Sequence, residues 1–460
     1  MVSISSRLRD VKDDPAMLFD ADVVDRACRD CGHGWRDRTL GPLATLEAMA
    51  VQMLHGNTSI AHVVSLMGDR FSESAFCQAR ARLPVGVTRA VLHDFVDRAD
   101  DVGGDGGRWR GLRVVVADGT GVSVPDAAAL RRRYRVAGGL GEGCGLPCPS
   151  VLGAFRADDG LLLELHVAPA CTRDLKHAQD LHPALRPGDV LVGDRGLCGY
   201  VHLAQLLQRG CHGLFRMPTS RTMPFPARSG ARRRYTYSRH RRSEPIMVKR
   251  ISPEDQIVEI VKPHNRPEHL TPEAFARIPG KLVVRAVRLR IVARGFRTRE
   301  LTLLTTLLDA EKYSAADLAE LYQLRWRVET NLRHLKRTLG MDRLKCESVE
   351  GVTHEMLMLA LIYNAVCHVR NLTAQALSLE PSRLSFVGAL RAIRMLVDQR
   401  PRGWVKSPLA LPRPPNLKAW PLRPMRTHPR QIKRAHSSFP VMTRSRSRCV
   451  AWLVTRGASG

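Results

Sequence analysis

The chain has 460 residues, 44% of them hydrophobic and 25% charged, which is ordinary for a soluble globular protein of several domains. Its charge is not ordinary, because 72 lysines and arginines outnumber 44 aspartates and glutamates and leave a net charge of +28. This excess favours a nucleic-acid partner, since each neutralised phosphate releases condensed counterions.

The cysteines and the apolar segments argue against two other classes of protein. Eleven cysteines would suit a secreted disulfide protein, but the first residues, MVSISSRLRDVKDD, lack the apolar core of a signal peptide. No run of about 18 apolar residues follows, so no membrane span is expected. We expect free thiols in a cytoplasmic compartment. Cys28, Cys31 and His33 lack a second ligand pair at finger-like spacing, so no zinc site is expected there.

Residues 1–105 are predicted to be helical. Apolar residues recur at helical spacing, and Ser72 or Ser74 is a candidate cap of the third helix. The helices are expected at 45–56, 59–68, 75–83 and 88–100. The third would point Gln78, Arg80 and Arg82 outward, which suits DNA binding, although a helical bundle without a ligand has the same periodicity.

The pattern changes to that of a mixed α/β domain after a glycine-rich linker at 101–107. The runs LRVVVADGT and DVLVGDRG are typical of buried strands and end in Asp118 and Asp194. A hairpin is expected at 150–170, a helix at 200–210 and a strand at 212–217.

Residues 218–300 interrupt this pattern and are predicted to be a β-rich insertion. A basic segment comes first, and IMVKRI, QIVEIVK and KLVVRAVRLRIVA follow, each typical of a strand. The α/β pattern returns at 301–307, and helical stretches are expected at about 315–339 and 355–372. The residues from Arg400 onward are rich in proline and arginine, which favours a basic tail that is loosely ordered without DNA.

Asp118 and Asp194 are the first two candidate site residues. A carboxylate at the end of a strand stands at the sheet edge where sites of α/β domains form. One such aspartate is commonly a turn residue or a helix cap, but two of them in a basic chain favour a site. Asp174 and Asp180 compete for the second position, but neither ends an apolar strand.

The segment 321–340 presents the third candidate acid. At 100° per residue its polar side chains fall within roughly 80° of one another, beside a separate leucine-rich face. They are Tyr322, Arg325, Glu329, Arg333 and Lys336. Ion pairs between residues four apart would explain the charges. They would not explain one carboxylate among three cations and a phenol, an arrangement that suits a metal–phosphate site.

The spacing Tyr322-x2-Arg325-x3-Glu329-x6-Lys336 resembles the Tyr-Arg-Glu-Lys signature of the bacterial insertion-sequence-4 family of DDE transposases. The segments VADGT and GDVLVGDRGLCGY are similar to that family's first and second aspartate regions. Weaker likeness extends to SAFCQARARL and to HPRQIKRAHSSFPVMTRSR in the tail, so the resemblance covers nearly the whole chain.

The resemblance implies that Asp118, Asp194 and Glu329 are the catalytic, metal-binding residues. Hard oxygen ligands suit two Mg²⁺ ions, with Mn²⁺ as a substitute, which together promote an in-line displacement at phosphorus. Water would be the first nucleophile and would release a 3′-hydroxyl, which then attacks a phosphodiester. No covalent protein intermediate is needed, and no other cofactor is expected.

The resemblance also implies double-stranded DNA partners, namely the terminal inverted repeats of an insertion sequence and a target. The phosphates would be held by Tyr322, Arg325, Arg333 and Lys336. Joining two ends suggests a dimer on DNA, in a bacterial cytoplasm and associated with the nucleoid.

The implied fold is α/β, with a ribonuclease-H-like catalytic domain interrupted by the β-rich insertion and preceded by a helical DNA-binding domain. The stretch between Asp194 and Glu329 is too long for a simple connection, which agrees with an insertion. The predicted domains are a helical N-terminal DNA-binding domain (1–105), the first part of the catalytic domain (108–217), the insertion (218–300), the second part of the catalytic domain (301–395) and a basic tail (396–460).

Related enzymes pass through a DNA hairpin, with a flipped base stacked on an aromatic residue of the insertion. The insertion here has no tryptophan, so Phe225, Tyr235 or Tyr237 would have to stack the base, and the hairpin route stays open. Structural roles are expected for Asp126 and His177, and a packing role for Trp326.

Two other functions remain open. One is a catalytically inactive or domesticated DNA-binding protein, against which the three intact acids argue. The other is a different ribonuclease-H-like nuclease acting on RNA or branched DNA, against which the Tyr-Arg-Glu-Lys helix and the long insertion argue.

Overall fold

A computed structural model gives the positions of most of the chain. It describes residues 18–36, 39–102, 108–134, 136, 145–169, 174–218, 223–226, 245–290 and 300–398. The expected basic tail and most of the basic start of the insertion lie outside these residues.

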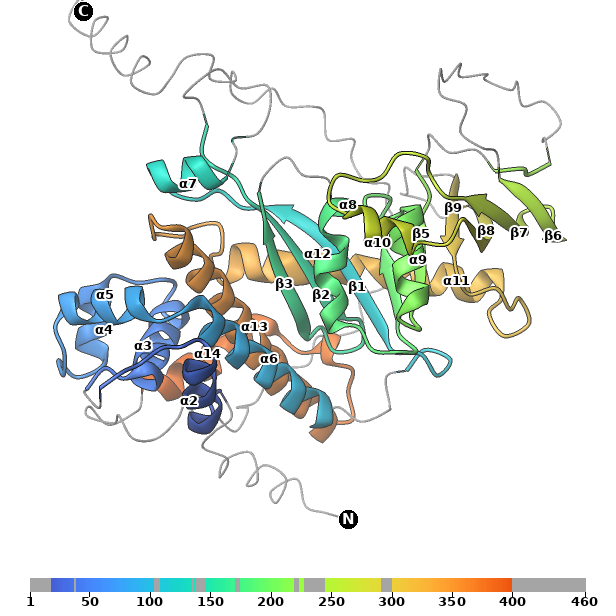
Figure 1. Ribbon diagram of the computed structural model, residues 1–460. Helices are drawn as coiled ribbons and strands as arrows, with labels where there is room; N and C mark the ends of the chain where they lie inside the picture. Colours follow the sequence, from blue (N-terminus) through green and yellow to red (C-terminus); the bar gives the residue numbers. More distant parts are fainter. Residues whose placement is uncertain are drawn as a thin grey trace, which may run out of the picture.

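Five helices open the described part of the chain, and they gather beside the sheet together with the C-terminal helices (Figure 1). They are α2 (Ala21–Asp30), α3 (Pro42–Leu54), α4 (Ile60–Leu66), α5 (Glu73–Arg82) and α6 (Val85–Val102). Ser72 caps α5, since its hydroxyl accepts a hydrogen bond from the Ala75 amide at 3.1 Å, which confirms the expected cap. The sequence does not predict α2.

Arg80 does not point outward, so that part of the prediction for α5 is wrong. Its guanidinium donates to Oε1 of Gln52 at 2.9 Å and lies 4.0 Å from the buried Glu355. Arg80 therefore joins the N-terminal helices to the rest of the fold, because an arginine fork can reach several buried acceptors at once. Gln78 and Arg82 are exposed, as expected.

Nine strands of the described residues form one mixed sheet in the order β3-β2-β1-β4-β5-β9-β8-β7-β6. They are β1 (Val114–Gly121), β2 (Ser150–Arg156), β3 (Leu162–Ala168), β4 (Val190–Gly193), β5 (His212–Arg216), β6 (Ile246–Ser252), β7 (Asp255–Val261), β8 (Lys281–Arg290) and β9 (Glu300–Thr305). The pairs β1–β4 and β4–β5 are parallel, and the other neighbours are antiparallel. The mixed α/β prediction is confirmed.

The β-rich stretch does not form a sheet of its own. Its strands β6, β7 and β8 follow one another in antiparallel order, and β8 pairs with β9 from Arg285–Thr305 to Arg290–Glu300. Because β9 also pairs with β5, these strands extend the central sheet instead of leaving it. Figure 1 shows this extension at the end of the sheet far from the N-terminal helices.

Helices cover the two faces of the sheet. The helix α9 (Tyr200–Gln208) packs on β5, and the central helix α13 (Val349–Ala376) packs near β3. Asn364 of α13 donates to and accepts from the backbone of Leu162 at 2.8 Å, which fixes the helix against the sheet. The other helical segments outside the 315–339 region are α7 (Ala128–Arg133), α8 (Asp174–His177), η2 (Ala178–Ala184), α10 (Pro272–Ala276), η4 (Pro381–Arg383) and α14 (Phe386–Asp398).

The helix α13 is also long and apolar enough to cross a membrane by length and composition alone, although the sequence had predicted no such run. Of its most apolar window, 94% is buried inside the fold. A central core helix of a soluble protein has the same composition, and the burial of α13 favours that explanation.

The helix expected at 315–339 is broken into three segments. They are α11 (Ala315–Gln323), α12 (Arg325–Arg333) and the π-helical η3 (His334–Thr338). Ser314 begins α11 with a capping box that includes Asp317. Because of the turn at Leu324 and the wider spacing of the π-helix, successive residues of this segment do not all advance by 100° around one helix axis.

Candidate active site

Asp118 and Asp194 lie side by side on neighbouring central strands. In the parallel β1–β4 pair, Ala117 is opposite Gly193, so the two aspartates take the next matching position. Asp194 follows the last residue of β4, as predicted. Asp118 does not end its strand, because β1 continues against β2 as far as Gly121. It lies beside the point where β4 stops and the sheet opens.

Backbone amides orient both carboxylates. The amide of Gly119 donates to Oδ1 of Asp118 at 2.9 Å, and the amide of Gly196 donates to Oδ1 of Asp194 at 2.5 Å. The two acids are thus positioned by their own strand ends.

Arg216 extends this row, and the sequence analysis missed it. Phe215 of β5 is opposite Gly193 of β4, so Arg216 matches Asp194 in the parallel register. Arg216 is also one of the cations that act on the Tyr322 hydroxyl. The sequence shows only that Arg216 ends the apolar segment HGLFR, because the neighbour of β4 is set by the pairing register.

Arg325 connects Asp118 with Glu329. Its Nη1 lies 3.5 Å from Oδ2 of Asp118, and its Nη2 donates to Oε1 of Glu329 at 3.1 Å. The Arg325 side chain is 12% exposed, whereas that of Glu329 is 46% exposed. One buried guanidinium therefore balances two of the three acids and brings the third acid from α12 to the edge of β1.

Two aromatic residues flank this guanidinium. The Arg325 guanidinium carbon lies 5.9 Å from the centre of the Tyr322 ring and 5.0 Å from that of Trp326. Burial raises the pKa of Tyr322, and Asp194 raises it further, against the opposing charges of Arg325 and Arg216. Tyr322 is therefore a neutral phenol near Asp194, able to donate a hydrogen bond.

Trp326 has an environment different from the expected one. The sequence favoured a packing role, but its side chain is 41% exposed beside Arg325. Of the aromatic residues expected to stack a base, Phe225 lies under Arg288 at 4.4 Å, and Tyr235 and Tyr237 lie outside the described residues.

Lys336 and Arg333, the other two residues predicted to bind phosphate, point in different directions. Lys336 of η3 donates to the carbonyl of Gly121 and lies 3.4 Å from the Thr120 hydroxyl, so it reaches the end of β1 beyond Asp118. Arg333 is exposed at the end of α12. The π-helical segment that carries Lys336 turns this side chain toward the sheet.

The donor set of the three acids fits hard divalent cations, because all three offer carboxylate oxygens. Their oxygens are not drawn together as closely as in a preformed cage. Among the described residues, one group of three His, Cys, Asp or Glu has its ligand atoms within 4.8 Å of one another, and it is another cluster. Here a guanidinium holds Asp118 and Glu329 together.

Other residues singled out from the sequence take structural positions. Asp126 forms an ion pair with Arg131, and His177 contacts Asp180 at 3.0 Å, both as expected. Asp180 of η2 does not share a site with Asp118, because its carboxylate contacts His166 of β3 and His177 of α8. Cys28 is buried and Cys31 is exposed, and no disulfide joins the cysteines that the structure describes.

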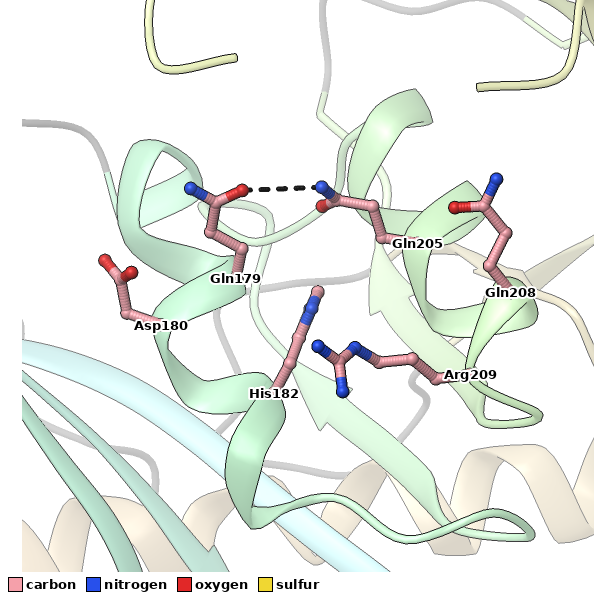
Figure 2. Close-up of a pocket in the computed structure, with 6 residues that line it drawn as sticks. All are labelled: Gln179, Asp180, His182, Gln205, Gln208 and Arg209. Atoms are coloured by element: carbon pink, nitrogen blue, oxygen red, sulfur yellow. Dashed lines mark hydrogen bonds between the residues drawn. The ribbon is translucent and has the colours of Figure 1, made fainter. Parts of the chain in front are cut away.

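A hollow lies elsewhere, between η2 and α9 (Figure 2). It has a volume of about 380 Å³ and a polar lining, made by Gln179, Asp180, His182, Gln205, Gln208 and Arg209. Gln205 donates across it to Gln179 at 3.4 Å. None of the three acids of the central strands lines it, so it is not the candidate active site.

Comparison with known proteins assigns the chain to a family. No curated protein matches the chain. The fold is similar to that of the piggyBac transposase in a synaptic complex with hairpin DNA, at 10% identity and a TM-score of 0.43, over 84% of this chain and 79% of that one. A family model of the transposase DDE domain matches residues 109–365. This domain implies a polynucleotidyl transferase, and enzymes that contain it generally use divalent metal ions. This match spans more than half of the sequence and includes all three acids, so the chain belongs to the DDE transposase family.

Proposed function

We propose that this chain is the transposase of a bacterial insertion sequence of the insertion-sequence-4 group and that it cleaves and joins DNA at Asp118, Asp194 and Glu329. The observation that carries the proposal is the row of Asp118 and Asp194 on adjacent strands, to which Arg325 ties Glu329. A mixed sheet with two acids on central strands and one on a covering helix also supports a ribonuclease-H-like fold.

When bound at these acids, Mg²⁺ would polarise the scissile phosphate and lower the pKa of an attacking water. The carboxylates of Asp118 and Asp194 are held by backbone amides and need little reorganisation. Glu329 is half exposed on α12 and can turn, so it would complete the donor set as the substrate enters.

The surrounding cations and hydroxyl would hold the DNA. Arg325 would exchange its carboxylate partners for a phosphate, since its guanidinium forms the same bidentate pairs with both. Lys336 and Arg216 lie at the ends of β1 and β5 and would bind flanking phosphates, with Arg333 reaching outward from α12. Tyr322 would donate its phenolic hydrogen to a phosphate oxygen. These contacts position the backbone without reading sequence.

The exposed Trp326 adds a candidate for base stacking to Phe225, Tyr235 and Tyr237, because any aromatic face can stack a flipped base for about 1–3 kcal/mol. Two chains would join two transposon ends, so we propose a dimer on DNA, in the bacterial cytoplasm at the nucleoid. The net charge of +28 supports binding of this polyanion.

Strand cleavage of the element's own terminal repeats tests the proposal. The wild-type chain with Mg²⁺ should release a 3′-hydroxyl at the transposon end, and Asp118→Asn, Asp194→Asn and Glu329→Gln should each lose this activity by at least about 100-fold, as removal of one electrostatic partner does elsewhere. Glu320→Gln, an exposed acid on α11, is the matched control and should cut normally.

Any of three outcomes would contradict the proposal. Cleavage at the wild-type rate by any one of the three variants would remove that residue from the site. Specific binding of the ends by a wild-type chain that never cuts them would favour a DNA-binding protein without catalysis. Cleavage of RNA or branched DNA in preference to transposon ends would favour another nuclease.

A further inference from the structure

A second group of possible metal ligands lies away from the three acids. His166 of β3, His177 at the end of α8 and Asp180 of η2 offer ligand atoms that all lie within 4.8 Å of one another. No sequence motif joins them, because His166 is contributed by a strand and the other two by the connection before β4. All three side chains are half-buried.

The two groups lie on opposite faces of the sheet. His166 is opposite Leu152, which in turn is opposite Gly119, whereas Asp118 is opposite Gly153. Neighbours along a strand point to opposite faces, so His166 shares a face with Gly119 and not with Asp118. The cluster is therefore separate from the candidate active site.

The distances in the cluster match the edges of a small coordination sphere. Nε2 of His166 is 3.2 Å from Oδ2 of Asp180, and Nδ1 of His177 is 3.0 Å from the same oxygen. A tetrahedral ion with bonds of about 2.0–2.1 Å has ligand atoms about 3.3–3.4 Å apart. An ion could enter with shifts of a few tenths of an ångström at these two edges.

The chemistry of the three donors is that of a zinc site. Burial lowers the pKa of His166, which favours the neutral imidazole that a metal needs. Each neutral imidazole can move its one N–H to the other ring nitrogen, so binding requires no net loss of a proton from either histidine. Two imidazoles and a carboxylate suit Zn²⁺ better than Mg²⁺, which prefers oxygen ligands alone.

The connection between β7 and α10 lies next to the cluster. Lys176, next to His177, forms an ion pair with Glu268 at 2.7 Å, which holds this connection against α8. The following residue, His269, is half-buried, and burial together with Lys176 and His177 lowers its pKa while Asp180 opposes this change. His269 is not one of the residues whose ligand atoms lie within 4.8 Å of one another.

We propose that His166, His177 and Asp180 bind a Zn²⁺ ion, with a water molecule in the fourth position. The ion would join the sheet at β3 to the α8–η2 connection that precedes β4. Figure 2 shows Asp180 on η2 with its carboxylate directed away from Gln205 and Arg209, toward the side of the hollow where no other labelled residue lies.

Metal analysis of the purified, full-length chain tests this site. The chain is stripped with a chelator and titrated with Zn²⁺, and Co²⁺ is used as a visible-absorbing probe of tetrahedral coordination. We expect one Zn²⁺ per chain at this site, a tetrahedral Co²⁺ spectrum with nitrogen ligands, and a higher Tm with Zn²⁺. His166→Ala and His177→Ala should each weaken Zn²⁺ binding about 100-fold.

Two further variants serve as checks: Asp180→Asn on folding and His264→Ala on specificity. Asparagine retains the shape and a hydrogen-bond acceptor, so Asp180→Asn should stay folded and still lose most of its Zn²⁺ affinity. His264 is an exposed histidine of the connection between β7 and α10, and its replacement should leave Zn²⁺ binding unchanged. Asp118→Asn should also leave Zn²⁺ binding intact, so failure of the active-site proposal is seen separately.

The proposal is overturned if the wild-type chain binds no Zn²⁺, or if the folded Asp180→Asn and His177→Ala variants bind it as tightly as the wild-type chain. In either case the three residues form a hydrogen-bonded group only.

Discussion

Replacing Arg325 with alanine separates its two proposed roles, because they predict opposite changes. Without DNA, Arg325 neutralises Asp118 at 3.5 Å and Glu329 at 3.1 Å and so competes with divalent cations for their oxygens. With DNA, it is proposed to hold a phosphate. Arg325→Ala should therefore bind Mn²⁺ more tightly than the wild-type chain and cut transposon ends more slowly.

The size of the effect follows from distance and exposure. At an effective dielectric constant of about 20, unit charges 3.5 Å apart interact by roughly 5 kcal/mol, which is an upper bound for the Asp118 pair. The Glu329 side chain is 46% exposed, and such helical pairs contribute only about 0.3–0.5 kcal/mol. Between these limits, we expect removal of Arg325 to favour Mn²⁺ binding by about 1.4 kcal/mol, so the Mn²⁺ affinity should rise roughly tenfold.

Mn²⁺ binding is measured by electron paramagnetic resonance and cleavage on a labelled transposon end. The matched control is Arg327→Ala, because Arg327 is on the same helix but donates to the carbonyl of Ala157 at 2.7 Å. Any binding at the histidine cluster is common to all variants and cancels. Arg325→Ala with unchanged Mn²⁺ affinity would refute the competition, and unchanged cleavage would refute the phosphate contact.

Three further predictions follow from single features of the fold. Lys336→Ala should weaken binding to all DNA sequences alike and reduce the slope of affinity against salt by about 1, measured by fluorescence anisotropy at several salt concentrations. Burial lowers the pKa of His182 to about 3 and that of His202 to about 4. Both imidazoles stay neutral in the folded chain, whereas in the unfolded chain they bind protons below about pH 6.5. The free energy of unfolding should therefore fall between pH 7 and 5 by on the order of 2 kcal/mol per histidine, as measured by urea titrations. Arg285 and Asp255 form a buried pair at 2.5 Å, and Arg285→Met should cost about 3–5 kcal/mol of stability because it leaves a buried carboxylate alone.

Each of these has its own control. Lys345→Ala removes an exposed lysine outside the site and should keep the wild-type salt slope. Arg290→Met changes an exposed arginine of the same strand as Arg285 and should leave stability unchanged. A free energy of unfolding that stays constant from pH 7 to 5 would contradict buried neutral imidazoles.

The strands that carry the site could be predicted because their sequences are unambiguous. VVVADG and VLVG are β-branched runs bounded by turn residues, and both occur as β1 and β4. The sequence could not show where β1 ends, because that depends on its partner. β2 continues the ladder past Asp118 while β4 stops before Asp194, and only the pairing register decides this.

The helix that carries Glu329 was predicted as one piece because its apolar residues keep helical spacing throughout. The break at Leu324 and the π-helical turn at 334–338 arise where the chain packs against the sheet and η3 meets β1. Tertiary contacts override local propensity in this way. The helical spacing therefore predicted correctly that Arg325 and Glu329 lie together. Lys336 instead reaches the sheet from the π-helical segment.

Groups that the topology alone assembles were beyond the sequence. Arg216 joins Asp194 only through the β4–β5 register, and His166 meets Asp180 only because η2 packs on β3. No spacing rule links residues contributed by separate elements in this way. Buried positions such as Arg80 depend similarly on acceptors far along the chain, here Gln52 and Glu355.

Whether the three acids converge on metal ions is tested most directly by diffraction from crystals of the chain bound to a transposon end and Mn²⁺. The anomalous signal should show ions with oxygens of Asp118, Asp194 and Glu329 at about 2.1 Å, the distance for a small hard cation. Ions held elsewhere, or a Glu329 side chain that stays paired with Arg325 and touches no ion, would contradict the proposed active site.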